Sequence, residues 1–458
     1  MTSLPHKNRF AQSMVAFSAV AVMTTPLHAE TAWELANRYA GQAIKAYPAL
    51  QVERQNVAIA ETKEHQALGA LMPSVDVGSR YTSSMGGREI RFDINDLLPA
   101  SVIPVDVPPT VIPFLRAHEQ ETKVTVTQPL FTGGGLYRSW KSARKSETAT
   151  REMFKGTVNS LAYSIRKASF DAFAAQEVVE LRTVQLAQAR EQLRTVQSKY
   201  ETQVVSASEV KRAEASLAEA EADSIAASGN ALLAAAVVNR YLGKPFDSPL
   251  DTPEASTTLP PLSITLDEAK QRAMSSRPEL KSIASSIGAA KEGAAASRSG
   301  YLPNVVFAGE YGFQGEEYAF NKDSEYGRAS LVMSWNMFEG RRTSAKIQQA
   351  KLVQKQLNYK QQEARDGILL DVTSAWLTAT SRNREWQAAR RGVIAATEGY
   401  RMTQQLFEAG MASQLQLLDA RAALTGAGTA EIVARYSFLT ALADLERSTG
   451  TALEGEDQ

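Results

Sequence analysis

Cysteine is absent from this chain of 458 residues. Its absence excludes disulfides, thiolate metal sites, cysteine nucleophiles and a lipid-modified cysteine. Histidine is scarce, and only His65 and His118 lie beyond the first 29 residues. We expect both to be surface residues rather than metal ligands or acid-base catalysts. Lysine plus arginine equal aspartate plus glutamate at 50 each, so the excess of positive charge typical of nucleic-acid-binding proteins is missing.

Long apolar runs are also lacking beyond the amino terminus. Residues 1–29 combine a basic start, an apolar stretch and the ending Leu27-His28-Ala29, which is the pattern of a signal peptide. A short membrane anchor is the alternative. The longest later apolar run, Ala231 to Val238, is far below the ~20 residues that a helix needs to cross a bilayer. We therefore expect an exported chain that has no transmembrane helix after cleavage.

Motifs of catalysis are missing as well. The sequence has neither a P-loop nor a GxSxG element. Gly133-Gly134-Gly135 lies between a strand pattern and a helix, as a phosphate loop would, but it lacks the spacing and closing lysine of one. We predict a tight turn there, and we predict no enzyme, metal or cofactor. Two interpretations, a cation site and a hydrated loop, are compatible with a cluster of five acidic residues: Glu310, Glu316, Glu317, Asp323 and Glu325.

The dominant feature that is present is an internal repeat. The stretch from Leu331 to Lys346 begins with strand-like alternation and turns into a charged helix at a glycine, and Val124 to Lys145 does the same. Such repeats set the architecture of a chain. An offset of 207 aligns the residues of the two strand-to-helix turns: Phe131 with Phe338, and Gly133 with Gly340.

The repeat divides the chain into five parts. A signal peptide (1–29) precedes the first repeat (30–243), a linker rich in proline, serine and threonine (244–265), the second repeat (266–450) and a short tail (451–458). Each repeat is expected to contain helices, two strands and a long helical hairpin. The predicted strands are 74–82, 122–130, 304–313 and 328–337.

Long helices are predicted in both repeats. The first arm, which begins near Tyr137, has about 65 residues and would be roughly 100 Å long. A helix of that length needs coiled-coil packing against its neighbours. The chain is predicted to reverse near Ser206 and again at Gly410 and Ser413. Residues 85–120 hold five prolines and are predicted to form a loop without strands, because proline removes ladder hydrogen bonds.

The predicted strands alternate apolar residues with small or polar ones. In a soluble sheet this alternation gives a buried face and a wet face, whereas in an outer-membrane barrel it gives a lipid face and a lumen face. Four strands cannot close a barrel, and open edges are not tolerated in lipid, so several chains would have to share one barrel. Aromatic residues near strand ends suit either setting: Tyr81, Tyr311, Phe313 and Trp335.

Over nearly all of its mature length, the sequence resembles the TolC family of outer-membrane channel proteins. The resemblance is carried by YPAL and RPEL at helix starts, LMPSV and YLPNV before strands, and QPLFTGGG and WNMFEGRR after them. It implies a mainly α fold with a small β part, in which two tandem repeats supply four barrel strands and long coiled-coil helices. It also implies a homotrimer with a twelve-stranded β-barrel in outer-membrane lipid and an α-helical periplasmic tunnel.

The resemblance further implies partners and a site. The partners are a periplasmic adaptor and an inner-membrane pump of the RND or ABC type. The site is a constriction at the periplasmic tip, lined by inward carboxylates, for which Gln416 and Asp419 are the matching positions; such rings favour cations. In a known family member an arginine and a tyrosine latch the closed state, and this chain departs from that latch with Ala412 and Phe407. The hypothesis for closure is a network of three residues: Glu209, Arg212 and Asp419.

Solvated helix charges are the alternative reading of that network. For the whole chain the sequence favours a passive export channel, with efflux preferred over the outer-membrane part of type I protein secretion. A soluble periplasmic coiled-coil scaffold is the alternative from another class.

Overall fold

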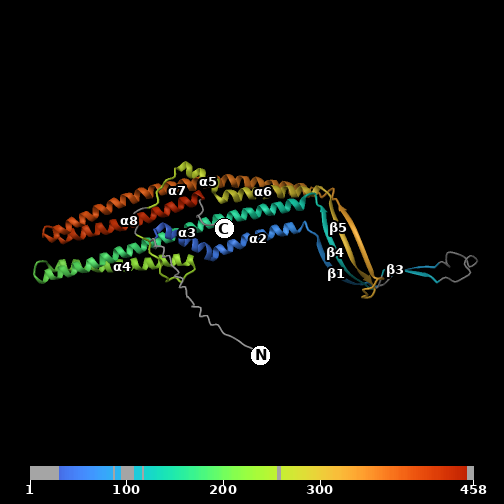
Figure 1. Cartoon of the computed structure of the whole chain (residues 1–458), viewed down its shortest axis with the longest axis horizontal. Helices are drawn as coiled ribbons and strands as arrows, with labels where there is room; N and C mark the ends of the chain where they lie inside the picture. Colours follow the sequence, from blue (N-terminus) through green and yellow to red (C-terminus); the bar gives the residue numbers. More distant parts are fainter. Residues whose placement is uncertain (1–29, 86–87, 94–107, 116–117, 255–258, 451–458) are drawn as a thin grey trace, which may run out of the picture.

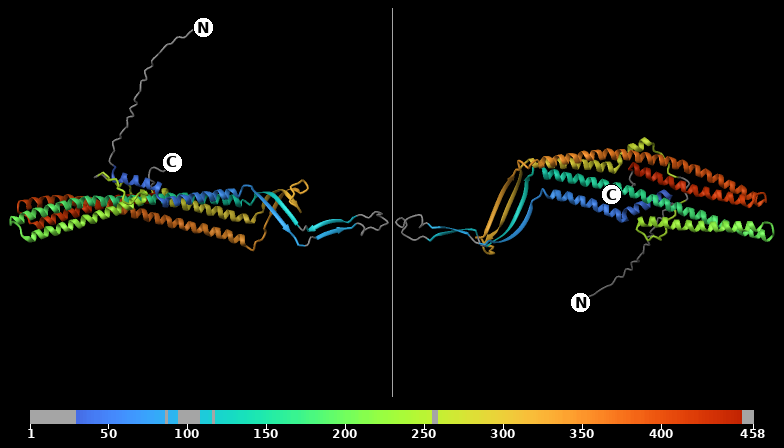
Figure 2. Two further views of the ribbon diagram at one scale, coloured as in Figure 1. Left: turned by 90° about the horizontal axis from the view of Figure 1, so that it is seen from below. Right: turned by 180° about the vertical axis from the view of Figure 1, so that it is seen from behind.

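The protein is an elongated molecule with helices at one end and strands at the other (Figure 1). The computed structural model describes residues 30–85, 88–93, 108–115, 118–254 and 259–450. The predicted signal peptide, the tail and a small part of the linker lie outside these residues. Figure 2 shows that the strands bend away from the line of the helices, and that one hairpin extends beyond the main sheet.

Among the described residues, the first half of the chain has two helices, four strands and then a long helical hairpin. In chain order its elements are α1 (Ala32–Ala46), α2 (Pro48–Gly69), β1 (Ser74–Ser83), β2 (Arg88–Phe92), β3 (Thr110–Leu115), β4 (His118–Phe131), α3 (Gly135–Glu201) and α4 (Ala207–Leu242).

The second half repeats this order without the β2–β3 hairpin. Its elements are α5 (Leu266–Ser276), α6 (Pro278–Arg298), the short 3-10 helix η2 (Ser299–Tyr301), β5 (Asn304–Gly315), β6 (Glu325–Ser334), α7 (Arg342–Glu408) and α8 (Gln414–Thr449). None of the described helices has both the length and the hydrophobicity of a membrane-spanning helix.

The main sheet is antiparallel, with the strand order β1-β4-β5-β6. Val77 lies opposite Val124, which lies opposite Tyr311. The neighbouring row of the sheet contains Asp76 of β1 and Glu310 of β5, which both lie opposite the same residue of β4. Because directly opposed residues share a face, the register separates an apolar face from a polar one.

The edge strands of this sheet are largely exposed in the described chain, whereas most residues of β4 and β5 are half-buried. Strand β1 is exposed along its whole length, and Val77 and Leu331 are 75% and 68% exposed. Strands β1 and β6 are the edges of the sheet and leave one side of their backbones without a strand partner among the described residues. A single chain therefore presents an incomplete sheet with an uncovered apolar face.

The helices continue the order of the strands. Helix α2 leads into β1, β4 leads into α3, α6 leads into β5 through η2, and β6 leads into α7. Neighbouring helices pack in the same sequence, α2 on α3, α3 on α6 and α6 on α7 (Figure 1). The sheet and the helical layer therefore share the same two open edges, which are β1 with α2 and β6 with α7.

The largest apolar core of the described residues lies where the short helix α1 packs on α3 and α4, and α8 joins it through its contact with α3. Tyr39, Phe170 and Phe173 are buried there, and the ring of Tyr436 packs between the two phenylalanines. Both short helices start with a capping box, made by Thr31 with Glu34 in α1 and by Thr265 with Glu268 in α5. These caps fix where the chain enters the core in each repeat.

The prediction of a strandless loop at 85–120 is wrong for the segments that form β2 and β3. These strands pair with each other as a two-stranded sheet, and Pro113 sits opposite Glu89 beside a register shift. In a two-stranded ribbon each strand has one free edge, so a proline there need not break a ladder bond. Residues 94–107 of that prediction lie outside the described residues.

The last predicted strand, 328–337, is displaced. Strand β6 starts at Glu325 and ends at Ser334, so Trp335 lies past its end. The indole N–H of Trp335 donates to the carbonyl of Tyr301 at 3.1 Å, which ties this segment to the end of η2 instead of to the ladder. Strand β4 also starts earlier than the predicted 122–130, at His118.

The two strand-to-helix turns use the left-handed backbone region. In the first turn Gly133 and Gly134 have φ of 58° and 76°, and in the second Gly340 and Arg341 have φ of 58° and 66°. A residue with a Cβ in this region costs roughly 1–2 kcal/mol. Arg341 of the second turn therefore has a more strained backbone than Gly134, its counterpart in the first turn.

Replacing the first glycine in each turn tests this geometry. A Cβ on Gly133 would lie 2.8 Å from Cβ of Leu302, whereas a Cβ on Gly340 would meet nothing within 4 Å. We expect Gly133→Ala to lower the free energy of unfolding by about 2 kcal/mol more than Gly340→Ala, because it adds a steric clash to the same backbone strain. Thermal unfolding of the detergent-solubilised protein, followed by circular dichroism, measures the difference. Equal losses would contradict it.

Candidate functional site

The candidate site lies at the end of the molecule farthest from the sheet, where two helical hairpins reverse (Figure 1). Helix α3 turns into α4 between Glu201 and Ala207, and α7 turns into α8 between Glu408 and Gln414. The two reversals are equivalent positions of the repeat. They bring the predicted residues of the first and second halves to the same end of the chain.

The first reversal is closed by backbone bonds. Gln203 takes a φ of 59°, and the amide of Val204 donates to the carbonyl of Lys199 at 2.9 Å. Ser206, near which the reversal was predicted, is the N-cap of α4, but its hydroxyl makes no bond to the helix backbone. Its Oγ instead lies 2.8 Å from Oγ of Ser208.

The second reversal carries a full capping box. Gly410 takes a φ of 74°, and the Gln416 amide N–H donates to the hydroxyl of Ser413 at 3.3 Å. In return, the Ser413 amide N–H donates to Oε1 of Gln416 at 2.7 Å. The side chain of Gln416 is thus engaged in the cap, which is a different task from the predicted lining of a constriction.

The structure forms one part of the predicted closing network within a single chain. Arg212 Nη1 lies 3.5 Å from Oε1 of Glu209, one turn earlier on α4. Asp419 is exposed on α8, and no ion pair joins it to Arg212 among the described residues. The described residues therefore form the pair of Glu209 with Arg212, and the link from Arg212 to Asp419 stays a prediction.

The two hairpins touch near the tip through Phe407. The ammonium group of Lys199, in the last turn of α3, lies 4.7 Å from the ring centroid of Phe407, in the last turn of α7. Cations over aromatic faces attract by about 0.5–1 kcal/mol at exposed sites. Phe407 therefore joins the hairpins by a weak contact, and Ala412 has no side-chain group that could add an ion pair or hydrogen bond.

Sequence reasoning missed a row of polar residues on the inner side of α8. Gln414, Arg421 and Thr425 are all buried, and Arg421 is only 8% exposed. Among the described residues, Nε and Nη1 of Arg421 and Nε2 of Gln414 have no hydrogen-bond partner. An unpaired buried charge is strongly unfavourable. The tip part of α8 is therefore held less firmly than its length suggests.

Farther from the tip, the hairpins are joined by a polar network, in which Nε of Arg435 lies 3.3 Å from Oε1 of Glu431 but has no hydrogen-bond partner among the described residues. Glu177 on α3 pairs with Arg435 on α8 and accepts a hydrogen bond from the hydroxyl of Tyr436. On the same helix Glu431 accepts from the indole N–H of Trp386 on α7 at 3.0 Å. Burial and the bond to Glu177 raise the pKa of Tyr436, so its hydroxyl remains a donor. This network ties three helices together at one level.

The polar face of the sheet holds a second charged cluster. Nζ of Lys123 lies 3.2 Å from Glu121 and 3.1 Å from Glu310. The hydroxyl of Tyr326 donates to Glu121 at 2.6 Å. Glu310, one of the acidic residues considered for a cation site, is thus neutralised by a lysine. No group of residues that could hold a metal ion occurs in the described part of the chain.

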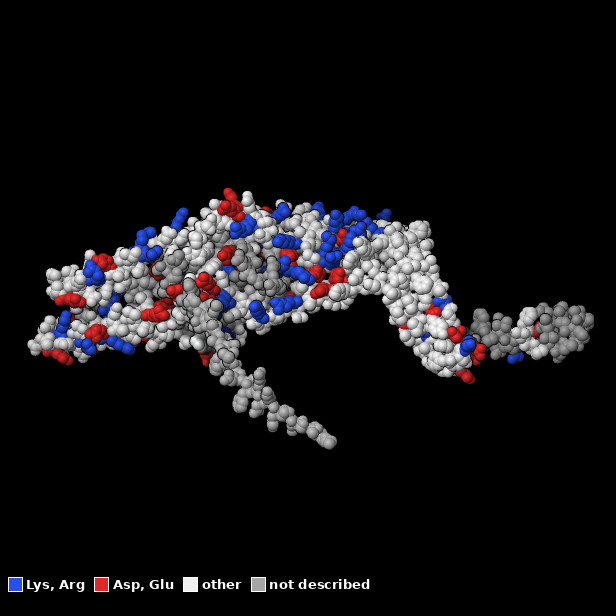
Figure 3. All heavy atoms as spheres, in the orientation of Figure 1, with Lys and Arg blue, Asp and Glu red and all other residues white. Residues whose placement is uncertain are grey.

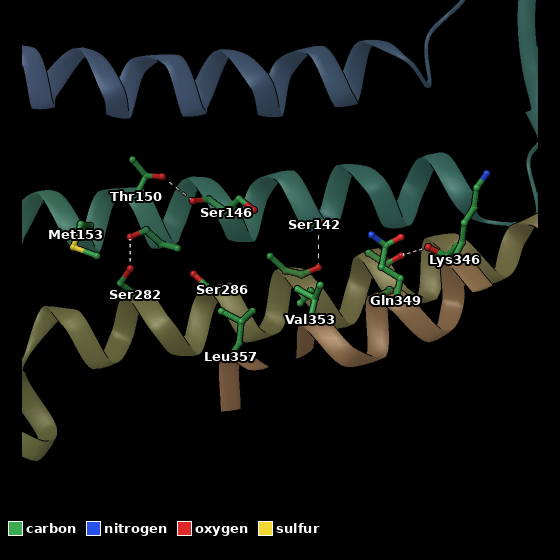
Figure 4. A pocket seen from close by; sticks show the side chains of 16 residues that line it. Ser142, Ser146, Thr150, Met153, Ser282, Ser286, Lys346, Gln349, Val353 and Leu357 are labelled. Atoms are coloured by element: carbon green, nitrogen blue, oxygen red, sulfur yellow. Dashed lines mark hydrogen bonds between the residues drawn. The ribbon is translucent and has the colours of Figure 1, made fainter. Parts of the chain in front are cut away.

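A groove of about 800 Å³ lies between α3, α6 and α7 (Figure 4). Its walls are mostly serine, alanine and threonine side chains. Ser142 and Ser282 donate their hydroxyl protons to the carbonyls of Ala289 and Ala149 across the helix pair. The small side chains and these bonds let the helices approach closely, so the groove has a packing role.

An open sheet with one apolar and one ion-paired face, joined in tandem to long helical hairpins, defines the class of outer-membrane channels with a helical periplasmic extension. The chain belongs to the outer membrane efflux protein family, whose model matches residues 40–244 and 269–451. The sequence resemblance to the TolC family is thereby confirmed. The scaffold alternative is excluded, because the family consists of outer-membrane channels that extend into the periplasm.

Known proteins resemble both the sequence and the fold. The chain is 24% identical to the alkaline protease secretion protein AprF of Pseudomonas aeruginosa, over 73% of this chain and 70% of that protein. It is 22% identical to the outer membrane protein TolC of Vibrio cholerae, over 69% and 74%. The CmeC outer membrane channel of Campylobacter jejuni has the same fold, with a TM-score of 0.74, 14% identity and coverage of 97% and 94%.

The two serine N-caps provide a matched test of the reversals. Removing a capping hydroxyl costs about 1 kcal/mol when it bonds the helix backbone. We expect Ser413→Ala to speed hydrogen exchange at the amides of the first turn of α8 about fivefold, because Gln416 loses its acceptor. Ser206→Ala should leave exchange in the first turn of α4 nearly unchanged. Equal acceleration in both helices would contradict the asymmetry.

Proposed function

We propose that three copies of the chain close their sheets into one twelve-stranded barrel and their helices into one tunnel. The observation that carries this proposal is the pair of open edges shared by the sheet and the helical layer, β1 with α2 and β6 with α7. Lipid does not tolerate unpaired strand edges, so the sheet has to be completed by other strands. Pairing β6 of one copy with β1 of the next would satisfy both edges of every chain.

In this assembly the apolar face of the sheet meets lipid and the polar face lines the lumen. Val77 and Tyr311 project to the lipid side, and the Lys123 cluster lies on the lumen side. The strands have 10 to 14 residues, and a tilted barrel strand needs about 9–11 to cross the membrane. Aromatic contacts of Phe313 with Tyr311 and Phe320 lie at the hairpin end, where barrels carry an aromatic girdle.

The assembled channel is a passive duct without turnover. A periplasmic adaptor and an inner-membrane pump of the RND or ABC type would deliver cargo to the tip and supply the energy. Efflux of small substrates is the favoured cargo assignment, in keeping with the family to which the chain belongs. Type I protein secretion is the second candidate, favoured by the similarity to the secretion protein AprF.

Deleting the gene separates the two assignments. Under efflux, the deletion strain becomes more susceptible to toxic compounds, and its secreted polypeptides are unchanged. Under secretion, a polypeptide disappears from the medium and susceptibility is unchanged. Complementation with the intact chain must restore the affected phenotype, and an unaltered strain in both assays would contradict the export function.

We further propose that Asp419 forms the ion-selecting ring of the closed tip. Its carboxylate is exposed on α8 within two turns of the reversal, and three copies would place three carboxylates around one axis. Glu209 and Arg212 on α4 of a neighbouring copy would complete the closing network. Gln416 contributes by capping α8 and so by positioning Asp419.

Single-channel recordings in planar bilayers test the ring. We expect Asp419→Ala to lower the cation-to-anion permeability ratio by about tenfold, because the ring loses its negative charge. Glu219→Ala is the matched control: it removes an exposed carboxylate of α4 that lies about 18 Å from the reversal, so the selectivity should change little. An unchanged ratio in Asp419→Ala would contradict the assignment.

Arg421 provides a test of tip opening. Replacing even a paired set of buried charges by apolar side chains of similar volume is often neutral or stabilising by about 1–4 kcal/mol, and two nitrogens of Arg421 lack a partner among the described residues. We therefore expect Arg421→Met to hold the tip closed and to reduce the open probability of single channels at least fivefold. Ala423→Met, an exposed position on the same helix, serves as the control. A rise in open probability for Arg421→Met would contradict the account.

A further inference from the structure

Basic side chains gather where the strands become helices. Figure 3 shows lysine and arginine side chains crowded over the helices next to the sheet. We call this set the junction band, and it contains Arg138 and Lys141 of α3, Arg298 of α6, Arg341, and Arg342 and Lys346 of α7. Two acidic residues stand beside it, Glu292 and Glu339, and each is paired with one of these arginines.

The band follows from an uneven distribution of charge along the two long helices. From Gly340 to Gln362 the chain has six basic residues and no aspartate or glutamate, although acids and bases balance over the whole chain. The first helix shows the same bias, since its first acidic residue after the turn is Glu147. The pattern occurs in both repeats, which differ in most other residues, so it belongs to the junction rather than to one helix.

Helix stability does not explain this placement. The amino-terminal end of a helix carries a partial positive charge, which favours acidic residues and disfavours basic ones. The short helices α1 and α5 follow this rule with acids in their first turns, but α3 and α7 have none there. Basic residues near the amino-terminal ends of both long helices are unfavourable for the helices themselves. Their presence at both ends points to an anionic partner outside the helices.

The immediate neighbours of the band are exposed apolar and aromatic residues. Met337 and Phe338 are 79% and 82% exposed, and Trp335 and Tyr301 are also exposed. The ammonium group of Lys141 lies 4.6 Å from the ring centroid of Tyr137. Aromatic rings with long basic side chains beside them are typical of the boundary between hydrocarbon and headgroups.

The band also has the right thickness for a headgroup layer. Arg341 and Lys346 are separated by five residues, a rise of roughly 8 Å along the helix. The polar layer on one side of a bilayer is about 5–8 Å thick. The next basic residues of α7 are Lys351, Lys355 and Lys360, which begin about 15 Å from Arg341 and lie beyond that layer.

We propose that the junction band binds anionic phospholipid headgroups of the periplasmic leaflet and fixes the depth of the barrel in the membrane. Phosphate oxygens would accept hydrogen bonds from the guanidinium groups of Arg341 and Arg342 and from the ammonium group of Lys346. The acyl chains would lie against Met337 and Phe338. The inference rests on the proposed function, in which the sheet is the part of the chain that spans the membrane.

The test compares two triple variants of the full-length protein in nanodiscs of phosphatidylethanolamine with a minor share of phosphatidylglycerol. The band variant is Arg341→Gln, Arg342→Gln, Lys346→Gln, and the control is Lys351→Gln, Lys355→Gln, Lys360→Gln. Both remove three positive charges from α7. Native mass spectrometry measures how far phosphatidylglycerol is enriched among the bound lipids. We expect the enrichment of phosphatidylglycerol to be about tenfold lower for the band variant than for the unmodified protein, and to be unchanged for the control.

Two further measurements distinguish phospholipid from free phosphate and from a second copy of the chain as the partner of the junction band. Inorganic phosphate at millimolar concentration should not displace the lipid; displacement would assign the band to free phosphate and overturn the proposal. A band variant whose copies dissociate in lipid-free detergent, while the control stays assembled, would assign the band to contact between copies and also overturn it. Equal enrichment in both variants contradicts it directly. Single-channel recordings of the unmodified protein test the proposed function separately. If the unmodified protein forms no conducting channel, that result contradicts the proposed function, whatever the lipid measurements show.

Discussion

The unpaired edges of the four-stranded sheet are the constraint on which the rest of the structure depends. Backbone N–H and C=O groups along β1 and β6 need partners, and lipid cannot supply them. The same edges continue into α2 and α7, so whatever completes the sheet also completes the helical layer. The exposed apolar face of the sheet is costly in water and favourable in hydrocarbon. In the proposed assembly, one chain is a sector of a larger closed barrel and tunnel.

The long hairpins are joined by different contacts along their length. Near the core around Tyr39 and Phe170, apolar burial and the Glu177 network join α3, α7 and α8. Near the tip, the hairpins meet through the weak contact of Lys199 with Phe407. A weak contact at this end suits the proposed channel, in which a partner has to open the tip.

The sequence was sufficient for the repeat, the strand pairs and the glycine turns, because these features have their own periodicity or backbone requirement. The β2–β3 hairpin was missed because proline was taken to exclude pairing, although a two-stranded ribbon has free edges that accept Pro113. Two features of the tip could have been found. The spacing of Ser413 and Gln416 is a capping-box pattern, and Arg421 occupies a core position of the heptad that runs through Gln414. The ring of Asp419 carboxylates stays a prediction, because it depends on the proposed assembly of several copies.

Disulfide trapping between strand edges tests whether β6 of one copy pairs with β1 of the next, and a chain without cysteine forms no competing disulfides. Ser79→Cys on β1 would be combined in turn with Gly327→Cys, Ala329→Cys or Leu331→Cys on β6, positions that share its face of the sheet. Oxidised membranes would then be analysed by denaturing electrophoresis without reductant. The account predicts a covalent species of three chains at one of these registers. Uncrosslinked single chains at every register, or a ladder extending beyond three chains, would contradict it.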